Sequence, residues 1–198
     1  MRNPPLVLAS TSRYRRELLG RLGWPFEVAA PGVDEAVVPG EAPAATALRL
    51  AEAKARAIAR QRLDALVIGS DQVADCDGVA VSKPADPADA AAMLRRLSGR
   101  TIVFHTAVVL VNAATGRVQR DCIDVASTFR ALSAEEIDAY LAREQPYDCA
   151  GAVKSEALGI ALFDRIESDD PTALIGLPLI ALARMLRSES VDVLRGPA

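Results

Sequence analysis

The chain has 198 residues, of which 51% are apolar, and its formal net charge at pH 7 is -3. This length suits a single domain, residues 1–198, with a sizeable core. The weakly acidic balance excludes a nucleic-acid polymer as the main partner, because binding to its backbone needs a broad excess of Lys and Arg. No apolar run approaches the length of a signal peptide or a membrane span, and three widely spaced cysteines fit a reducing compartment, so we expect a cytoplasmic protein that binds no membrane.

The only histidine, His105, limits the chemistry that the chain can perform. A single imidazole disfavours histidine-rich zinc sites and both Ser-His-Asp and Cys-His catalysis. Because His105 lies within the strand-like run 102–111, we expect it in the core or in a strand ladder. Any metal should therefore be a hard cation held by carboxylates, phosphates and water.

The first predicted elements are a short buried strand, 6–9, and a helix, 13–19, joined by a turn rich in hydroxyl groups. A helix N-terminus presents unpaired backbone N–H groups and the positive end of a dipole, so this arrangement favours an anion such as phosphate. Ser10 and Ser12 in the turn are therefore candidate phosphate ligands. Ser12 can also be the ordinary N-cap of the helix, and the two roles are compatible.

Arg15 differs from the other arginines of this helix in its angular position. At about 100° per residue it falls on the face of the leucines, whereas Arg13 and Arg16 fall away from them. An Arg on the apolar side of a first turn needs an anionic partner, and its planar guanidinium suits phosphate. We therefore favour ligand binding for Arg15 over a structural salt bridge, and we expect Arg13 and Arg16 to be solvated.

A second strand, 26–30, leads into a turn-rich loop with paired carboxylates, Asp34 and Glu35, and then into a helix over 43–61. Lys54 lies in the middle of the apolar face of this helix. A lysine is almost never buried without a partner, because desolvating an unpaired ammonium is costly. We expect Lys54 to meet a carboxylate or a ligand phosphate, with a long stem that reaches solvent as the alternative.

An apolar run at 65–68 predicts a strand covered on both faces, which ends abruptly in small and polar residues with one carboxylate, Asp71. Because ligands gather where such strands end, Asp71 is a candidate catalytic residue. From this segment alone, a turn-capping role is equally compatible. A hairpin signal at 75–78 and a return strand at 79–81 then place Lys83 near the strand that carries Asp71.

The second half of the chain contains fewer chemical signals. It predicts helices at 86–97, 133–143 and 178–187, a long β-ribbon from 101–111 and 118–129, a small-residue loop at 147–156 and a strand at 160–166. Early alternation of strands and helices, followed by a β-ribbon, predicts an α/β fold with a mixed sheet and two lobes around a substrate cleft. The sequence contains neither a P-loop nor a glycine motif for dinucleotides.

One group of residues stands apart by position. Its members are Ser10, Ser12, Arg15, Glu35, Lys54, Asp71 and Lys83. They combine cations on apolar faces or beside turns with isolated carboxylates. That combination suits a phosphate chain bound with a divalent cation, where catalysis is largely charge neutralisation and orientation of an attacking water. By itself it does not separate hydrolysis from binding.

Several motifs in the chain are shared with a known family. They are S-x-S-x-x-R at 10–15, Val33-Asp34-Glu35, Leu50-Ala51-Glu52-Ala53-Lys54-Ala55, Gly69-Ser70-Asp71-Gln72-Val73 and Ser82-Lys83-Pro84. Through them, and over nearly its whole length, the chain resembles the Maf family of nucleoside triphosphate pyrophosphatases. Gln72 and Glu156 resemble the 7-methyl-GTP branch of that family, because the thymidine and uridine triphosphate branch typically has Thr and Gln at these positions.

The resemblance implies hydrolysis of the α–β phosphoanhydride of a nucleoside triphosphate to a monophosphate and diphosphate, with Asp71 as the proton acceptor for water. It implies phosphate binding by Arg15, Lys54 and Lys83. It gives Glu35 a supporting role toward either the substrate or a divalent metal cation such as Mg²⁺ or Mn²⁺, with Asp71 as the other residue at the metal. An elongated, twisted sheet flanked by helices, and a homodimer, are further expectations from the family.

The substrate-selecting positions of the family fall on Tyr14, Gln72 and Glu156. A 7-methylguanine ring carries a positive charge, so stacking on Tyr14 would gain a cation–π contribution of about 0.5–2 kcal/mol. A carboxylate at Glu156 could accept hydrogen bonds from the N–H groups of guanine. The chain departs from the family at Arg13, which is commonly proline, and at Tyr14, which is often tryptophan in this branch.

Two alternatives remain open at this point. One is a pyrophosphatase of the same family that acts on dTTP and UTP. The other is a non-catalytic regulator that binds a nucleotide, for which the cations would be needed but Asp71 would not.

Overall fold

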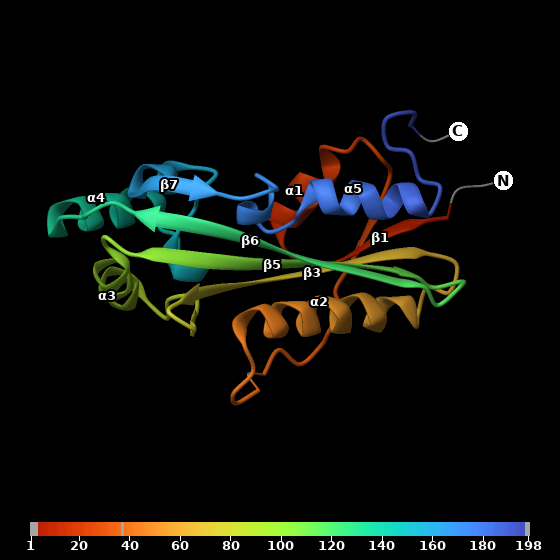
Figure 1. Ribbon diagram of the computed structural model, residues 1–198, viewed down its shortest axis with the longest axis horizontal. Coiled ribbons are helices and arrows are strands. Elements are labelled where there is room, and N and C mark those ends of the chain that lie inside the picture. The colour runs from red at the N-terminus through yellow and green to blue at the C-terminus, as the bar shows by residue number, and fades with distance from the viewer. Residues whose placement is uncertain (1–3, 37, 197–198) are drawn as a thin grey trace.

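The computed structural model describes residues 4–36 and 38–196, which form a seven-stranded mixed sheet flanked by helices (Figure 1). The strands are β1 (Leu6–Ala9), β2 (Glu27–Ala29), β3 (Leu66–Cys76), β4 (Val79–Val81), β5 (Thr101–Asn112), β6 (Val118–Phe129) and β7 (Phe163–Glu167). The helices are α1 (Arg13–Gly20), α2 (Pro43–Ala59), α3 (Pro87–Leu97), α4 (Ala134–Glu144) and α5 (Leu179–Ser188), with 3-10 helices η1 (Ala150–Ala152), η2 (Leu158–Leu162) and η3 (Ala173–Ile175). The predicted α/β fold with a mixed sheet is confirmed.

The strands follow the order β2-β1-β3-β5-β6-β7, and β4 pairs with the end of β3. β1 is parallel to β2 and β3, whereas the pairs from β3 through β7 are antiparallel. The long strands β3, β5 and β6 give the sheet an elongated, twisted shape, as expected from the family (Figure 1). α2 covers one face, α1 and α5 cover the other, and α3 and α4 lie at the end away from the chain termini.

The core consists of three clusters of buried side chains. One joins the alanine-rich face of α2 to the sheet, and a second joins the leucines of α1 and α5 to the opposite face. Both follow the apolar spacing of their helices. The third cluster lies among α3, α4 and the far ends of the long strands. The first two clusters together form the core of one lobe, and the third forms the core of the other. These are the two lobes that the sequence predicts.

Gly69 sets the distance between α2 and β3. A Cβ atom at this position would lie 2.1 Å from the Ala51 carbonyl oxygen and 2.8 Å from the Ala55 nitrogen. No side chain fits there, because both neighbours are backbone atoms that cannot rotate away. The glycine therefore lets α2 lie directly on the strand that carries Asp71.

The prediction that a strand ends near Asp71 is wrong, because β3 continues from Leu66 to Cys76. β5 pairs with it over nearly this whole length and supplies backbone partners to the polar residues as well as the apolar ones. On its other edge, β1 pairs with 66–68 and β4 with 74–76. Within the described residues, the segment 69–73 has no strand on that edge, and Asp71 lies at the middle of this interruption.

The other predicted elements are confirmed with small changes in their bounds. The strand predicted at 160–166 begins later, because η2 occupies Leu158–Leu162 before β7 starts. Pro178 is the N-cap of α5, one residue before its first turn. Ser12 and Ser133 cap their helices as predicted, the latter in a complete capping box.

His105 lies in the β5 ladder, as predicted. Its Nδ1 is 2.6 Å from Asp124 Oδ1, and its Nε2 is 3.3 Å from Asp75 Oδ2. All three cysteines are free thiols. In the part of the chain that the structure describes, no helix is both long and apolar enough to span a membrane.

Candidate active site

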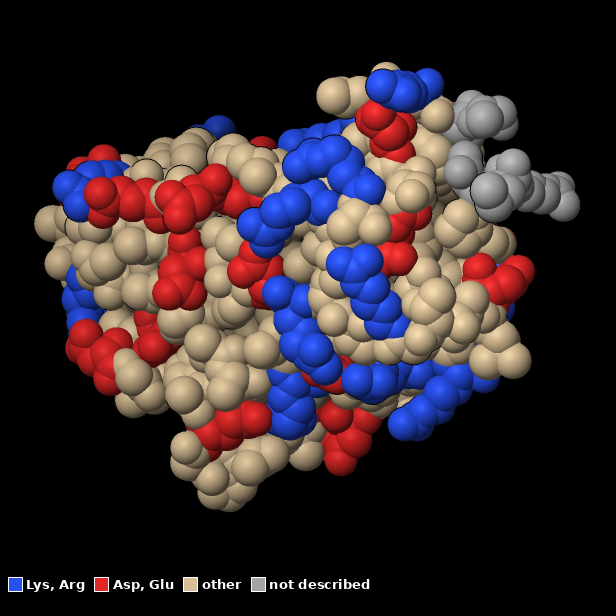
Figure 2. All heavy atoms as spheres, turned by 45° about the vertical axis from the view of Figure 1, so that its right-hand side comes forward, with Lys and Arg blue, Asp and Glu red and all other residues tan. Residues whose placement is uncertain are grey.

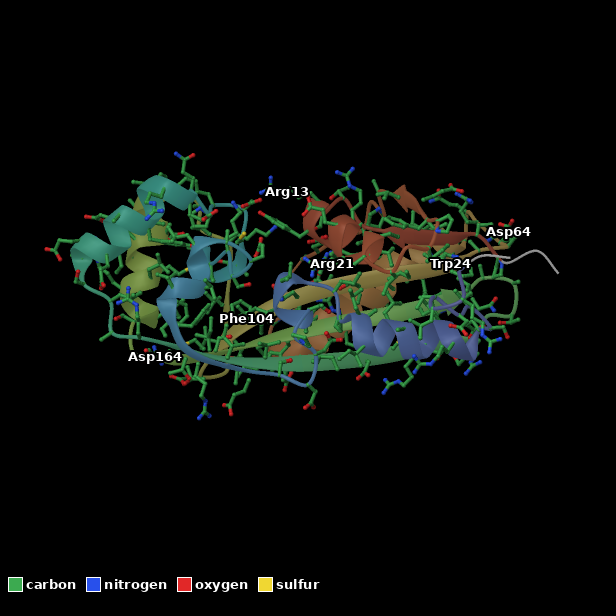
Figure 3. The ribbon with its side chains drawn as sticks, turned by 90° about the horizontal axis from the view of Figure 1, so that it is seen from above. Arg13, Arg21, Trp24, Asp64, Phe104 and Asp164 are labelled. Carbon is green, nitrogen blue, oxygen red and sulfur yellow. The ribbon has the colours of Figure 1, made fainter. Side chains whose placement is uncertain are left out.

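Two adjoining cavities lie between the lobes and bring together every site residue that the sequence predicts. The larger, of about 470 Å³, is lined by Ser10, Ser12, Arg15, Glu35, Lys54, Asp71 and Lys83, among others. The smaller, of about 140 Å³, is lined by Tyr14, Gln72 and Glu156 together with residues of both lobes. Figure 3 shows Arg13 at the end of α1 that faces the lobe of α3 and α4. We call these the phosphate cavity and the base cavity, after the roles predicted for their residues.

Lys54 lines the phosphate cavity. It is 5% exposed, and its Nζ is 2.6 Å from Asp71 Oδ1 and 2.7 Å from Glu35 Oε1. The prediction that Lys54 meets an anion is confirmed, and the anions are two carboxylates. Losing one member of a buried ion pair typically costs about 3–5 kcal/mol, because the other charge stays buried and uncompensated. Lys54 therefore holds Asp71 in place. Its ammonium has three N–H donors, and the two carboxylates account for two of them.

Arg15 enters both cavities from α1. Its Nε donates to the Gly176 carbonyl oxygen at 2.9 Å, and no described carboxylate lies within ion-pair distance of its guanidinium. Burial lowers the pKa of Arg15, and the nearby charges of Asp71 and Glu35 oppose that change. The structural salt bridge, which the sequence left as the alternative to ligand binding, is therefore absent from the described residues. The terminal N–H groups of Arg15 can donate to an anion.

Lys83 completes the positive side of the phosphate cavity. It follows β4, which folds back on the end of β3 as the hairpin signal predicts. Its side chain is exposed and forms no ion pair with a described residue. Lys83 lines both cavities.

Tyr14 lines both cavities at the end of α1. The Tyr14 hydroxyl accepts a hydrogen bond from Arg13 Nη2 at 2.6 Å and donates to Asp148 Oδ2 at 3.3 Å. The Arg13 guanidinium also lies over the ring, 4.6 Å from its centroid. Arg13 is exposed as predicted, but it is engaged with the ring rather than only solvated.

Gln72 and Glu156 line the base cavity from separate elements, β3 and the loop between η1 and η2. The Gln72 amide nitrogen donates to the carbonyl oxygens of Ala173 and Leu174, each at 3.0 Å. Glu156 is exposed at the rim, in the loop between η1 and η2. The structure thus brings the three substrate-selecting residues of the family to one cavity, while their roles in selection remain predictions.

The carboxylates of the phosphate cavity suit one kind of metal site. Asp71 and Glu35 both lie within 2.7 Å of the same lysine nitrogen, so they face a common region. Mg²⁺ often binds to one or two carboxylates and completes its shell with substrate phosphate oxygens and water. The described residues contain no group of three or more His, Cys, Asp and Glu side chains that could hold a metal. The two carboxylates therefore fit a cation that binds together with the phosphates of a nucleotide.

Three residues of the site region were not predicted. Asp148 lines both cavities, Ser70 donates to the Gly176 carbonyl oxygen at 2.9 Å, and Thr106 donates to the Ala173 carbonyl oxygen at 2.9 Å. Ser70 could have been predicted as a site residue, because it is the neighbour of Asp71 in the sequence. Thr106 carries no local signal, because its partners Gln72 and Ala173 are 34 and 67 residues away in the chain. Asp148 carries none for its contact with Tyr14, which is 134 residues away.

Comparison with known proteins gives one consistent result. The family model described as "Maf-like protein" matches residues 5–189. A 7-methyl-GTP pyrophosphatase of Thiobacillus denitrificans is 59% identical over 99% of this chain and 98% of its own length. Proteins of the same name from Ralstonia nicotianae and Burkholderia pseudomallei are 58% and 56% identical over 93% and 98% of this chain and 95% and 92% of their own lengths. By this match of family and relatives, the chain belongs to the Maf-like protein family.

Proposed function

We propose that this protein is a nucleoside triphosphate pyrophosphatase that hydrolyses 7-methyl-GTP to 7-methyl-GMP and diphosphate. The observation that carries the proposal is the clustering of Arg15, Lys54 and Lys83 with Asp71 in one cavity that opens into a second, smaller one. The relatives named 7-methyl-GTP pyrophosphatase, which are more than half identical over nearly the whole chain, support the choice of substrate.

In this proposal Asp71 accepts a proton from the water that attacks the α-phosphorus. The bond between the α-phosphorus and the bridging oxygen breaks, and diphosphate leaves with that oxygen. Lys54 keeps the Asp71 carboxylate in position, and Arg15 and Lys83 neutralise the charge that develops on the phosphate oxygens. Ser10 and Ser12 frame the turn at the α1 N-terminus, whose unpaired backbone N–H groups favour an anion.

A divalent cation, Mg²⁺ or Mn²⁺, is the expected cofactor. When bound, it would withdraw charge from the phosphate oxygens and so lower the barrier to hydrolysis. Asp71 and Glu35 are the residues that would hold it.

The base cavity suits a cationic base in this proposal. The Tyr14 ring offers a surface for stacking, with a cation–π contribution of about 0.5–2 kcal/mol. The Glu156 carboxylate adds negative charge and accepts hydrogen bonds, whereas a neutral amide at that position would also present donors. Both features favour 7-methylguanine over an uncharged pyrimidine.

The test is a turnover assay on a panel of nucleotides with Mg²⁺ or Mn²⁺, in which diphosphate release is measured. We expect 7-methyl-GTP to give the highest kcat/KM. Asp71→Asn should lose about a hundredfold or more in kcat, as expected for removal of a general base, and still bind the nucleotide. Asp164→Asn is the matched control, because Asp164 is an exposed carboxylate on β7 that lines neither cavity.

Two results would overturn parts of this proposal. Preference for UTP or dTTP over 7-methyl-GTP would assign the chain to the other branch of the family. Binding without turnover under either metal would favour the regulator, which needs the cations but not Asp71.

We further propose that the chain is a single domain that acts as a homodimer in the cytoplasm. The three free thiols support a reducing compartment. Light scattering of the purified protein measures the assembly, and a monomeric mass would refute the dimer.

A further inference from the structure

One wall of the base cavity is a short segment near the C-terminus, which we call the wall segment, residues 173–176. It consists of η3, Ala173–Ile175, and the following Gly176. Leu174, Ile175 and Gly176 line the base cavity. Because the segment lies outside the sheet, its position depends on side chains that hold its carbonyl groups.

Two side chains of the sheet hold the first half of the wall segment. Thr106, on β5, donates through Oγ1 to the Ala173 carbonyl oxygen at 2.9 Å. Gln72, on β3, places Nε2 2.9 Å from Thr106 Oγ1 and 3.0 Å from each of the Ala173 and Leu174 carbonyl oxygens. Its two N–H groups serve these three acceptors, so one N–H is shared between two of them. Thr106 is fully buried and lines neither cavity.

The other end of the wall segment is tied to the phosphate cavity. The Gly176 carbonyl oxygen accepts from Ser70 Oγ at 2.9 Å and from Arg15 Nε at 2.9 Å. Gly176 has a φ of 120°, which side chains rarely adopt. The wall segment therefore contacts both the strand that carries Asp71 and the arginine expected to bind phosphate.

This network fixes which end of the Gln72 amide faces the substrate. The hydroxyl hydrogen of Thr106 is used on Ala173, so Thr106 presents a lone pair to Gln72 and requires an N–H in return. The two carbonyl oxygens impose the same orientation. No described residue donates to Gln72 Oε1, which leaves that oxygen as the part of the amide that can accept from a bound base.

We propose that Thr106 is a positioning residue for nucleobase selection. Its hydroxyl holds the wall segment against the sheet and keeps the Gln72 amide oriented with its oxygen toward the base cavity. This proposal rests on the proposed function, because it assigns the same cavity to the base of a nucleotide.

The test compares three variants. Thr106→Val keeps the shape of the side chain but removes the hydroxyl, and Thr106→Ser restores the hydroxyl in a smaller side chain. Ser127→Ala is the matched control, because Ser127 is a fully buried hydroxyl on the neighbouring strand, and no partner for its Oγ exists among the described residues. For each protein, kcat and KM are measured with 7-methyl-GTP, GTP and UTP, and Tm is recorded.

We expect Thr106→Val to lower the ratio of kcat/KM for 7-methyl-GTP to that for UTP by about fivefold, the usual effect of one hydrogen bond. The change should fall mainly on KM. Thr106→Ser should recover most of the ratio, and Ser127→Ala should leave it unchanged. An unchanged ratio, or an equal loss for every nucleotide with a lower Tm, would overturn the proposal, because a merely structural hydroxyl gives that result.

A binding measurement separates failure of this proposal from failure of the proposed function. Calorimetry gives Kd for 7-methyl-GMP and for UMP with the native protein and with Thr106→Val. If the native protein hydrolyses no nucleotide, the proposed function fails, yet a fall of about fivefold in the ratio of the two affinities still supports the role of Thr106. Equal ratios in the two proteins, or no binding of either monophosphate, would overturn it.

Discussion

At the scale of single residues, the cations of the phosphate cavity differ in their contacts and therefore in their expected roles. The Lys54 ammonium already contacts two carboxylates, so its first contribution is to hold them. Arg15 and Lys83 have donors that no described residue uses, and they are the better candidates for direct contact with phosphate. The phosphate-binding role predicted for Lys54 is therefore secondary to its contact with Asp71.

The base cavity also contains a thiol, Cys149, whose reactivity can be predicted. Burial raises its pKa to about 12, with the charge of Asp148 adding to the shift. Because the thiolate is the reactive form, only about one molecule in ten thousand is ionised at a pH of about 8.

We therefore expect iodoacetamide to label Cys149 slowly in the folded protein and fast in urea. The rate should rise about tenfold for each pH unit up to the pKa. Mass spectrometry of tryptic peptides measures the labelling. Rapid modification of the folded protein near neutral pH would show that the thiol is not protected in this way.

At the scale of elements, the site depends on the contact between α2 and β3. Lys54 reaches Asp71 because Gly69 lets the helix lie against the strand. Between β1 and β4, no described strand pairs with the edge of 69–73 opposite β5, and Asp71 and Gln72 of this segment line the phosphate cavity. A helix lysine and a strand carboxylate thus meet inside the protein without either being at the end of its element.

Gly69→Ala tests this contact. The new methyl group would lie 2.1 Å from the Ala51 carbonyl oxygen, so α2 must move away from the sheet. We expect a loss of about 3 kcal/mol or more in the free energy of unfolding, at the upper end of overpacking effects. Turnover should fall as well, because the movement separates Lys54 from Asp71.

Gly20→Ala is the matched control. Gly20 is the last residue of α1, and nothing lies within 4 Å of a Cβ placed there. This variant should be neutral or more stable by about 0.5–1 kcal/mol, because alanine favours the helix. Urea denaturation measures both variants, and equal stability of Gly69→Ala and native protein would contradict the packing argument.

At the scale of the whole molecule, the two lobes share one sheet and enclose the cavities between them. Lys and Arg side chains form a band across the face shown in Figure 2, with Asp and Glu beside them. Several surface arginines are paired, including Arg120 with Glu52 and Arg184 with Asp121. Arginines that are paired with carboxylates attract a polyanion only weakly, because their charges are already neutralised. This surface therefore agrees with a small anionic substrate rather than a nucleic-acid polymer.

Removal of divalent cations distinguishes a metal that serves catalysis from one that holds the fold. We expect EDTA to abolish turnover and to leave Tm unchanged, because the described residues form no closed metal site. Diphosphate added with Mg²⁺ should then stabilise the protein by about 2.7 kcal/mol at a hundredfold excess over Kd, or about 5–10 °C in Tm. Scanning calorimetry measures both effects, and a Tm that falls with EDTA would point to a structural metal.

Much of the fold follows from local patterns in the sequence. The apolar spacing of α2, the cap of α1 and the hairpin before β4 are set by neighbouring residues, so their predicted positions agree with the structure. The end of the central strand does not follow from such a pattern. The polar residues after Ile68 suggested a stop, yet pairing with β5 carries the strand through to Cys76. Partners distant in sequence override local propensity in a sheet.

The features of the site also divide into those that the sequence determined and those that only the tertiary structure decided. The sequence by itself determined that Lys54 needs an anion and that Arg15 differs from its neighbours, because angular position on a helix fixes which side chains become buried. Only the tertiary structure decided that the partners of Lys54 are Asp71 and Glu35. It also decided that Thr106 and Gln72 hold the wall segment. Those contacts join residues on separate elements, and their distances depend on how the helices and the sheet pack together.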